Sequence, residues 1–98
     1  MQQMNIPEEL RIPFNYEGAD VPAVISELRP QLFHDGEDYC CLLGPDIQSG
    51  IYGCGISTED ALRDWQQNLT KRITQPDESD EVALYAIDVL NASNRKVW

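Results

Sequence analysis

The cysteines and the single histidine are the side chains of this chain best suited to nucleophilic chemistry. Cys54 lies between two glycines, and His34 is the only histidine that could serve as its base. Such a pair needs hydrogen-bonding contact, and nothing in the sequence places these two residues together. Cys40, Cys41 and Cys54 form an odd set without a CxxC spacing, which argues against a disulfide framework and a four-ligand zinc site. We therefore expect reduced thiols, no metal or other cofactor, and no catalytic activity.

Glycines that lead into a helix could instead bind a small ligand. A backbone without side chains admits another backbone or an anion, and a helix N-terminus favours the anion. The segment contains no phosphate-loop motif, however, and Glu59 and Asp60 would compete with an anion for the helix terminus. Ligand binding is therefore the weaker interpretation, and its candidate turn consists of Gly50, Gly53, Gly55 and Ser57.

The charge of the chain favours a protein partner. Seven Lys and Arg against seventeen Asp and Glu give a net charge of -10 over 98 residues. This charge repels nucleic acid and anionic membranes, and no apolar run approaches the ~18 residues of a membrane span. With no secretion signal at its start, the chain is expected to be cytoplasmic and to bind a basic protein. The candidate contact residues are Asp60, Asp64, Asp77, Glu78, Asp80, Glu81 and, as an exposed interface anchor, Trp98.

Hydrophobic periodicity predicts the elements that position these residues. The length predicts one domain over residues 1–98, with a loose arm at 1–9 and a short tail at 91–98. A capping box in which Ser57 caps and Asp60 returns the contact marks the clearest helix start. The expected strands are Leu10–Tyr16, Tyr39–Leu43, Ile51–Ile56 and Val82–Leu90, and the expected helices are Asp20–Arg29 and Ser57–Ile73.

This element order, β-α-β-β-α-β, predicts the α+β class. We expect a small, mainly antiparallel sheet with two helices on one face. Val82–Leu90 is apolar on both sides, which is typical of an interior strand. Unpaired sheet edges would also permit homodimerisation.

Three short motifs resemble the signature of HicB-like antitoxins. They are Pro45-Asp46-Ile47, Gly50-Ile51 and the helix start Gly55-Ile56-Ser57-Thr58-Glu59-Asp60-Ala61-Leu62. The resemblance extends over about Tyr39 to Leu90 and implies a partial RNase H-like fold without catalytic carboxylates. It also implies a partner, a small basic ribonuclease toxin whose active site the acidic antitoxin covers. Full-length members usually carry a DNA-binding segment after the last strand, and only eight residues follow Leu90 here, so we expect no operator binding.

The sequence therefore predicts a non-catalytic, acidic, HicB-like antitoxin. The alternative is a stand-alone bacterial or phage accessory protein. Such a protein would sequester a small nucleotide-like ligand or inhibit a host defence protein.

Overall fold

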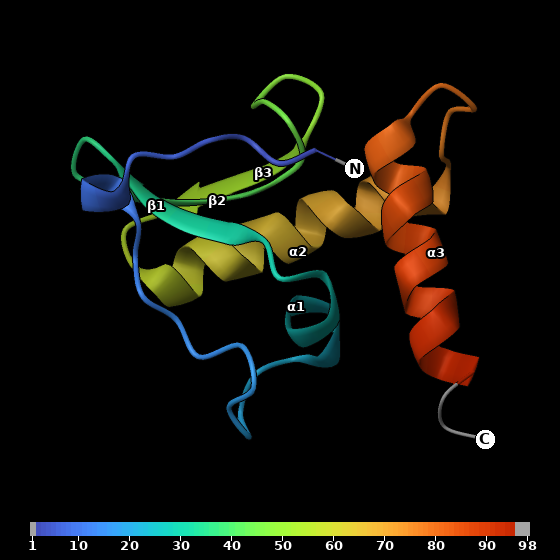
Figure 1. Ribbon diagram of the computed structural model, residues 1–98, viewed down its shortest axis with the longest axis horizontal. Helices are drawn as coiled ribbons and strands as arrows, with labels where there is room; N and C mark the ends of the chain where they lie inside the picture. The colour runs from blue at the N-terminus through green and yellow to red at the C-terminus, as the bar shows by residue number, and fades with distance from the viewer. Residues whose placement is uncertain (1, 96–98) are drawn as a thin grey trace.

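The computed structural model describes residues 2–95 as an α+β protein with a three-stranded antiparallel sheet (Figure 1). The α+β class and the antiparallel sheet are thus confirmed. The predicted element order is wrong, because two segments expected as strands adopt other structures and Gln31–Asp35 forms a strand that was not predicted. The elements are η1 (Glu8–Leu10), α1 (Ala23–Leu28), β1 (Gln31–Asp35), β2 (Asp38–Leu43), β3 (Ile51–Gly55), α2 (Thr58–Thr74) and α3 (Glu81–Arg95).

The sheet has two different faces. Strand β2 lies in the centre and pairs with both neighbours, so that Cys40 lies opposite Phe33 on one side and opposite Cys54 on the other. Because side chains alternate along a strand, these three residues share a face, which we call the outer face. Leu43 and Ile51 also pair across β2 and β3, and they point into the main core on the opposite face, which we call the helix face.

Helix α2 covers the helix face of the sheet (Figure 1). Ser57 caps it as predicted, because the Ser57 hydroxyl accepts a hydrogen bond of 3.2 Å from the Asp60 amide. The predicted return contact is replaced, because the Asp60 carboxylate accepts from Arg63 at 2.9 Å. Trp65 is fully buried, and its indole Nε1 donates to the Ile51 carbonyl oxygen at 2.9 Å. The helix approaches β3 so closely that a β-carbon on Gly53 would overlap the Trp65 backbone. The buried residues that α2 contributes to the core are Ala61, Leu62, Trp65 and Leu69.

The predicted strand Val82–Leu90 is wrong, because this segment lies in helix α3. Asp80 precedes the helix and accepts a hydrogen bond from the Ala83 amide at 3.1 Å, as an N-cap residue does. Val82, Ala83 and Ala86 are buried at helical spacing, whereas Leu84 is 43% exposed. The helix packs against α1 and α2 and not within the sheet (Figure 1). Residues 91–95 of the predicted tail extend this helix, and Trp98 lies outside the described residues.

The predicted strand Leu10–Tyr16 is also wrong. Only an isolated bridge joins Arg11 to Phe33, and the Ile12 amide donates to the Leu32 carbonyl oxygen at 3.0 Å. Pro13 has no amide hydrogen with which to continue the pairing. Every second side chain of the segment nevertheless points inward, as in a strand, because Ile12, Phe14 and Tyr16 all pack against the core. The next predicted element, helix Asp20–Arg29, shortens to α1, because Pro22 forms its N-cap and Arg29 leaves it with a φ of 51°.

The N-terminal segment, expected to be a loose arm, is held on the outer face of the sheet. Ile6 is 3% exposed and belongs to a small second core with Phe33, Cys40 and Leu42. The Met4 amide donates to the Gly44 carbonyl oxygen at 2.9 Å. Residues before η1 therefore cover apolar side chains that α2 cannot reach.

Candidate functional site

Four of the predicted contact acids lie together in the connection between α2 and α3. Asp77, Glu78 and Glu81 are exposed, and Asp80 is half-buried. The Ser79 amide and hydroxyl both donate to the Asp77 carboxylate, which holds the pKa of Asp77 below its ordinary value. We call Asp77, Glu78 and Glu81 the connection acids. They are the part of the predicted contact set that faces solvent.

Asp80 makes internal contacts instead. Arg72 donates to both Asp80 carboxylate oxygens at 2.6 Å, and these bonds hold the pKa of Asp80 below its ordinary value. Arg72 also donates to the Ser49 and Gly50 carbonyl oxygens, each at 2.9 Å. This side chain therefore joins the loop before β3, the end of α2 and the start of α3. It lines an open cleft of about 420 Å³ at this junction.

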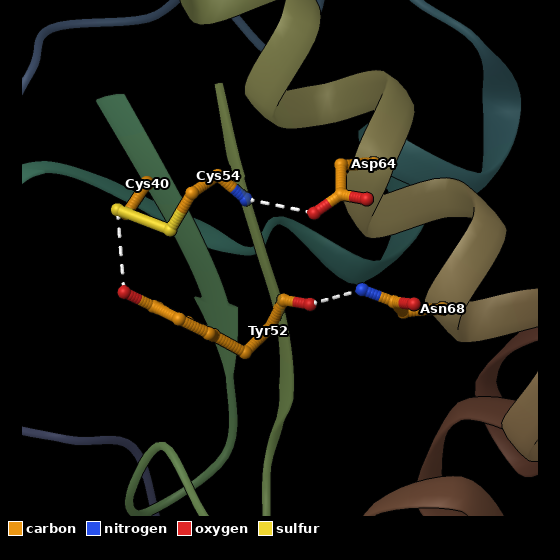
Figure 2. Close-up of a disulfide and its surroundings, with 5 residues drawn as sticks. All are labelled: Cys40, Tyr52, Cys54, Asp64 and Asn68. Carbon is orange, nitrogen blue, oxygen red and sulfur yellow. Dashed lines mark hydrogen bonds between the residues drawn. A yellow bond between two sulfur atoms is a disulfide. The ribbon is translucent and has the colours of Figure 1, made fainter. Parts of the chain in front are cut away.

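Asp60 and Asp64 lie at the other end of α2. From the end of α2 at Thr74, Asp60 lies about 21 Å away and Asp64 about 15 Å away at ~1.5 Å per residue, so the predicted set does not form one surface. Asp60 pairs with Arg63 at 2.9 Å, and the Asp64 carboxylate accepts a hydrogen bond of 3.0 Å from the Cys54 amide (Figure 2). Asp64 thus attaches α2 to β3.

A second acidic surface lies where β1 turns into β2. Asp35, Glu37 and Asp38 are exposed around this turn, and the bridge from Arg11 to Phe33 brings η1, with exposed Glu8 and Glu9, alongside β1 (Figure 1). No ion pair of residues 2–95 involves these five acids. We call them the acidic hairpin end. The contribution of η1 to this surface depends on the tertiary bridge between Arg11 and Phe33.

The candidate ligand turn is filled by the protein itself. A β-carbon on Gly53 or Gly55 would overlap the backbone of α2, and one on Gly50 would overlap the Asp46 and Leu43 carbonyl oxygens. The Ser57 hydroxyl is used as the helix cap. Gly53 and Gly55 therefore admit the backbone of α2, which was one of the two uses that the spacing of the glycines allowed.

The structure does not bring Cys54 and His34 together. Phe33 shares the outer face with Cys54, so the next residue, His34, points to the helix face, where its ring lies 4.8 Å from that of Tyr39. The expectation of reduced thiols is wrong for two cysteines, because Cys40 and Cys54 form a disulfide (Figure 2). The pairing of β2 with β3 sets their α-carbons 4.1 Å apart, and no CxxC spacing is required. Cys41 remains a buried free thiol whose pKa is raised by burial.

The disulfide has polar and acidic neighbours on the outer face. The Tyr52 hydroxyl donates to Cys40 Sγ at 3.3 Å (Figure 2). Burial raises the pKa of Tyr52, and the nearby Asp35 and Asp38 carboxylates raise it further. Cys40 is 1% exposed, whereas Cys54 is half-buried. The two cysteines of the disulfide therefore differ in their access to solvent.

Comparisons with protein-family models, with curated proteins and with solved structures found no match to this chain. Within residues 2–95, no three His, Cys, Asp or Glu side chains are grouped so that they could hold a metal ion. No helix in the same range is both long and apolar enough to cross a bilayer. The geometry and charge of the surfaces described above are therefore the basis for inferring function.

Proposed function

We propose that this protein is a non-catalytic acidic inhibitor that binds a small basic ribonuclease and covers its active site, as the resemblance to HicB-like antitoxins implies. The observation that carries the proposal is the acidic hairpin end. Its five carboxylates face solvent at one end of the sheet, and none of them pairs with a basic group of residues 2–95. An unneutralised cluster on a molecule of net charge -10 accelerates the approach of a basic protein.

The motifs of the resemblance support the proposal by their positions. Pro45-Asp46-Ile47 lies in the turn after β2, and Gly50-Ile51 leads into β3. Gly55 ends β3, and Ser57 caps α2. The same order of turn, short strand and capped helix underlies the HicB-like signature. Helix α3, in place of a final strand, is a difference from that pattern.

The contact surface is proposed to be the acidic hairpin end, with the connection acids in a secondary role. Asp60, Asp64 and Asp80 are already bonded within the chain, so a partner could recruit them only by breaking those contacts. The exposed acids of the hairpin end need no such rearrangement.

The test begins with the gene beside the one that encodes this chain, which the proposal expects to encode a small basic protein. RNA cleavage by that protein is measured while increasing amounts of the acidic chain are added. We expect cleavage to stop once a fixed molar ratio of the two proteins is reached. A neighbour without ribonuclease activity, or one whose activity the chain leaves unchanged, would refute the proposal.

Three double charge reversals, each changing the net charge by four units, then locate the surface. Glu37→Lys with Asp38→Lys should weaken binding roughly 100-fold, because two attractions become repulsions. Glu78→Lys with Glu81→Lys should have a smaller effect. Asp20→Lys with Glu27→Lys is the matched control and should reduce affinity by only about fivefold through the overall charge. Equal losses in all three variants would contradict a localised contact.

A further inference from the structure

We propose that the Cys40–Cys54 disulfide is a reversible thiol-exchange site that is attacked at Cys54 and that selects cationic over anionic small thiols. This inference does not depend on the proposed function. It rests on the unequal exposure of the two cysteines, on the Tyr52 hydroxyl beside Cys40 Sγ and on the nearby acids Asp35 and Asp38.

The fold determines which sulfur is attacked. Cys40 lies on the central strand under the N-terminal segment and is 1% exposed, whereas Cys54 lies on the edge strand β3 and is half-buried. An external thiolate reaches Cys54 Sγ more readily, so Cys40 becomes the leaving group. Exchange rates depend on access and on stabilisation of the leaving thiolate.

Tyr52 is placed to assist that departure. Its hydroxyl already donates to Cys40 Sγ at 3.3 Å (Figure 2). A hydrogen bond to a neutral sulfur is weak, and it strengthens when the sulfur becomes an anion. The contact therefore stabilises the product of the first step more than the disulfide.

The reaction is a two-electron exchange in two steps. A thiolate forms a bond to Cys54 Sγ while the bond between the two protein sulfurs breaks, and Cys40 leaves as a thiolate that takes a proton from water. A second thiolate then attacks the external sulfur of the mixed disulfide, releases the oxidised small disulfide and leaves Cys54 as a thiolate. The protein gains two electrons, and two small thiols lose one each.

Charge determines which thiols react fastest. Asp35 and Asp38 are register partners on the outer face, and Asp38 lies two residues before Cys40 on the same strand. Their fields reach the Tyr52 hydroxyl that contacts Cys40 Sγ. An incoming thiol with an ammonium group is attracted by these carboxylates, and one with a sulfonate or carboxylate group is repelled.

Contacts other than the disulfide hold β3 in place, so the folded chain can be reduced and oxidised again. Strand β3 is attached to α2 by three separate hydrogen bonds, two of which appear in Figure 2. These join Asp64 to the Cys54 amide at 3.0 Å, Asn68 to the Tyr52 carbonyl at 2.6 Å, and Trp65 to the Ile51 carbonyl at 2.9 Å. Cys41 points to the helix face, so it cannot exchange with the reduced pair.

The experiment follows reduction of the oxidised full-length chain by mass spectrometry. The probes are cysteamine, 2-mercaptoethanol and 2-mercaptoethanesulfonate, with rates corrected to equal thiolate concentration. At low ionic strength cysteamine should react about tenfold faster than the sulfonate, and the difference should nearly vanish at ~1 M salt. Acid-quenched mixed disulfide should map to Cys54, and the circular dichroism of the reduced chain should be retained.

Variants separate the roles of the neighbours. Asp35→Asn with Asp38→Asn should remove most of the preference, whereas Asp77→Asn with Glu78→Gln, beyond the far end of α2, should preserve it. Tyr52→Phe should slow reduction severalfold without changing the preference. Equal rates for the three thiols, a mixed disulfide on Cys40, or unfolding upon reduction would each overturn the proposal.

Discussion

The ion pair between Arg72 and Asp80 is expected to be a principal stabilising contact of this fold. Arg72 donates to both oxygens of the Asp80 carboxylate at 2.6 Å and to two loop carbonyl oxygens. The Arg72 side chain is 30% exposed and that of Asp80 is 16% exposed. The perturbation is a double-mutant cycle built from Arg72→Met and Asp80→Ala.

The expected coupling energy follows from this geometry. Two unit charges about 4 Å apart at an effective dielectric constant of ~20 attract by ~4 kcal/mol, and removal of both groups from water offsets part of this. A coupling of about 2 kcal/mol remains. Asp80→Ala also removes a helix cap worth ~1 kcal/mol, so this variant alone should lose about 3 kcal/mol. Arg72→Met should lose a similar amount, because it leaves the Ser49 and Gly50 carbonyl oxygens without their donor.

Urea unfolding measures the four corners of the cycle, and the chain contains a matched control. Arg63 and Asp60 also pair at 2.9 Å, but their side chains are 66% and 37% exposed. A cycle on that pair should give a coupling of at most ~0.5 kcal/mol. Equal couplings for the two pairs, or a value below ~0.5 kcal/mol for Arg72 with Asp80, would refute the reasoning that burial makes this contact strong.

Three further predictions concern packing, pH and redox state. Gly53→Ala should cost ~3 kcal/mol in urea unfolding because its β-carbon meets the α2 backbone, whereas Gly36→Ala, with open space but a φ of 64°, should cost only ~1 kcal/mol. The folded pKa of Asp80 is lowered, so its stabilisation is complete above the unfolded pKa of ~3.9 and is lost as pH falls through the folded value. Thermal melts should therefore be level from about pH 5 to 7 and should decline below about pH 4, less steeply in the Asp80→Ala variant. Replacing Cys40 and Cys54 together by Ala should lower the free energy of unfolding by ~3 kcal/mol, and reduction of the native chain should have the same effect.

Local signals in the sequence predicted the central part of the fold. The apolar run at Tyr39–Leu43 and the capping box at Ser57 correspond to β2 and the start of α2. The apolar run was predictable as a strand because it is short and ends at Gly44-Pro45, and the start of α2 was predictable because Ser57 can cap a helix. Alternation also identified the inward side chains of residues 12–16, although it could not show that Pro13 prevents the ladder from forming.

Helix α3 was not predicted, because an apolar run alone does not distinguish a buried strand from a helix. Val82, Ala83 and Ala86 fit helical spacing as well as they fit a strand that is buried on both sides. The deciding signal lay before the run, where Asp80 can cap and Glu81 favours the positive end of a helix dipole. The acids of this segment were interpreted as candidate contacts for a basic partner, so the cap was missed.

The disulfide and the acidic hairpin end required strand register, which no spacing rule contains. Cys40 and Cys54 are fourteen residues apart and become neighbours only because β2 pairs with β3 in one register, and a shift of one residue would place Cys41 opposite Cys54. The charge of an acidic residue likewise shows nothing about its availability to a partner. Asp64 and Asp80 belong to the predicted contact set, yet their carboxylates bond to the chain itself. Tertiary contacts therefore determine which carboxylates a partner can reach. The exposed acids of the acidic hairpin end support a basic partner more directly than the net charge of -10 does.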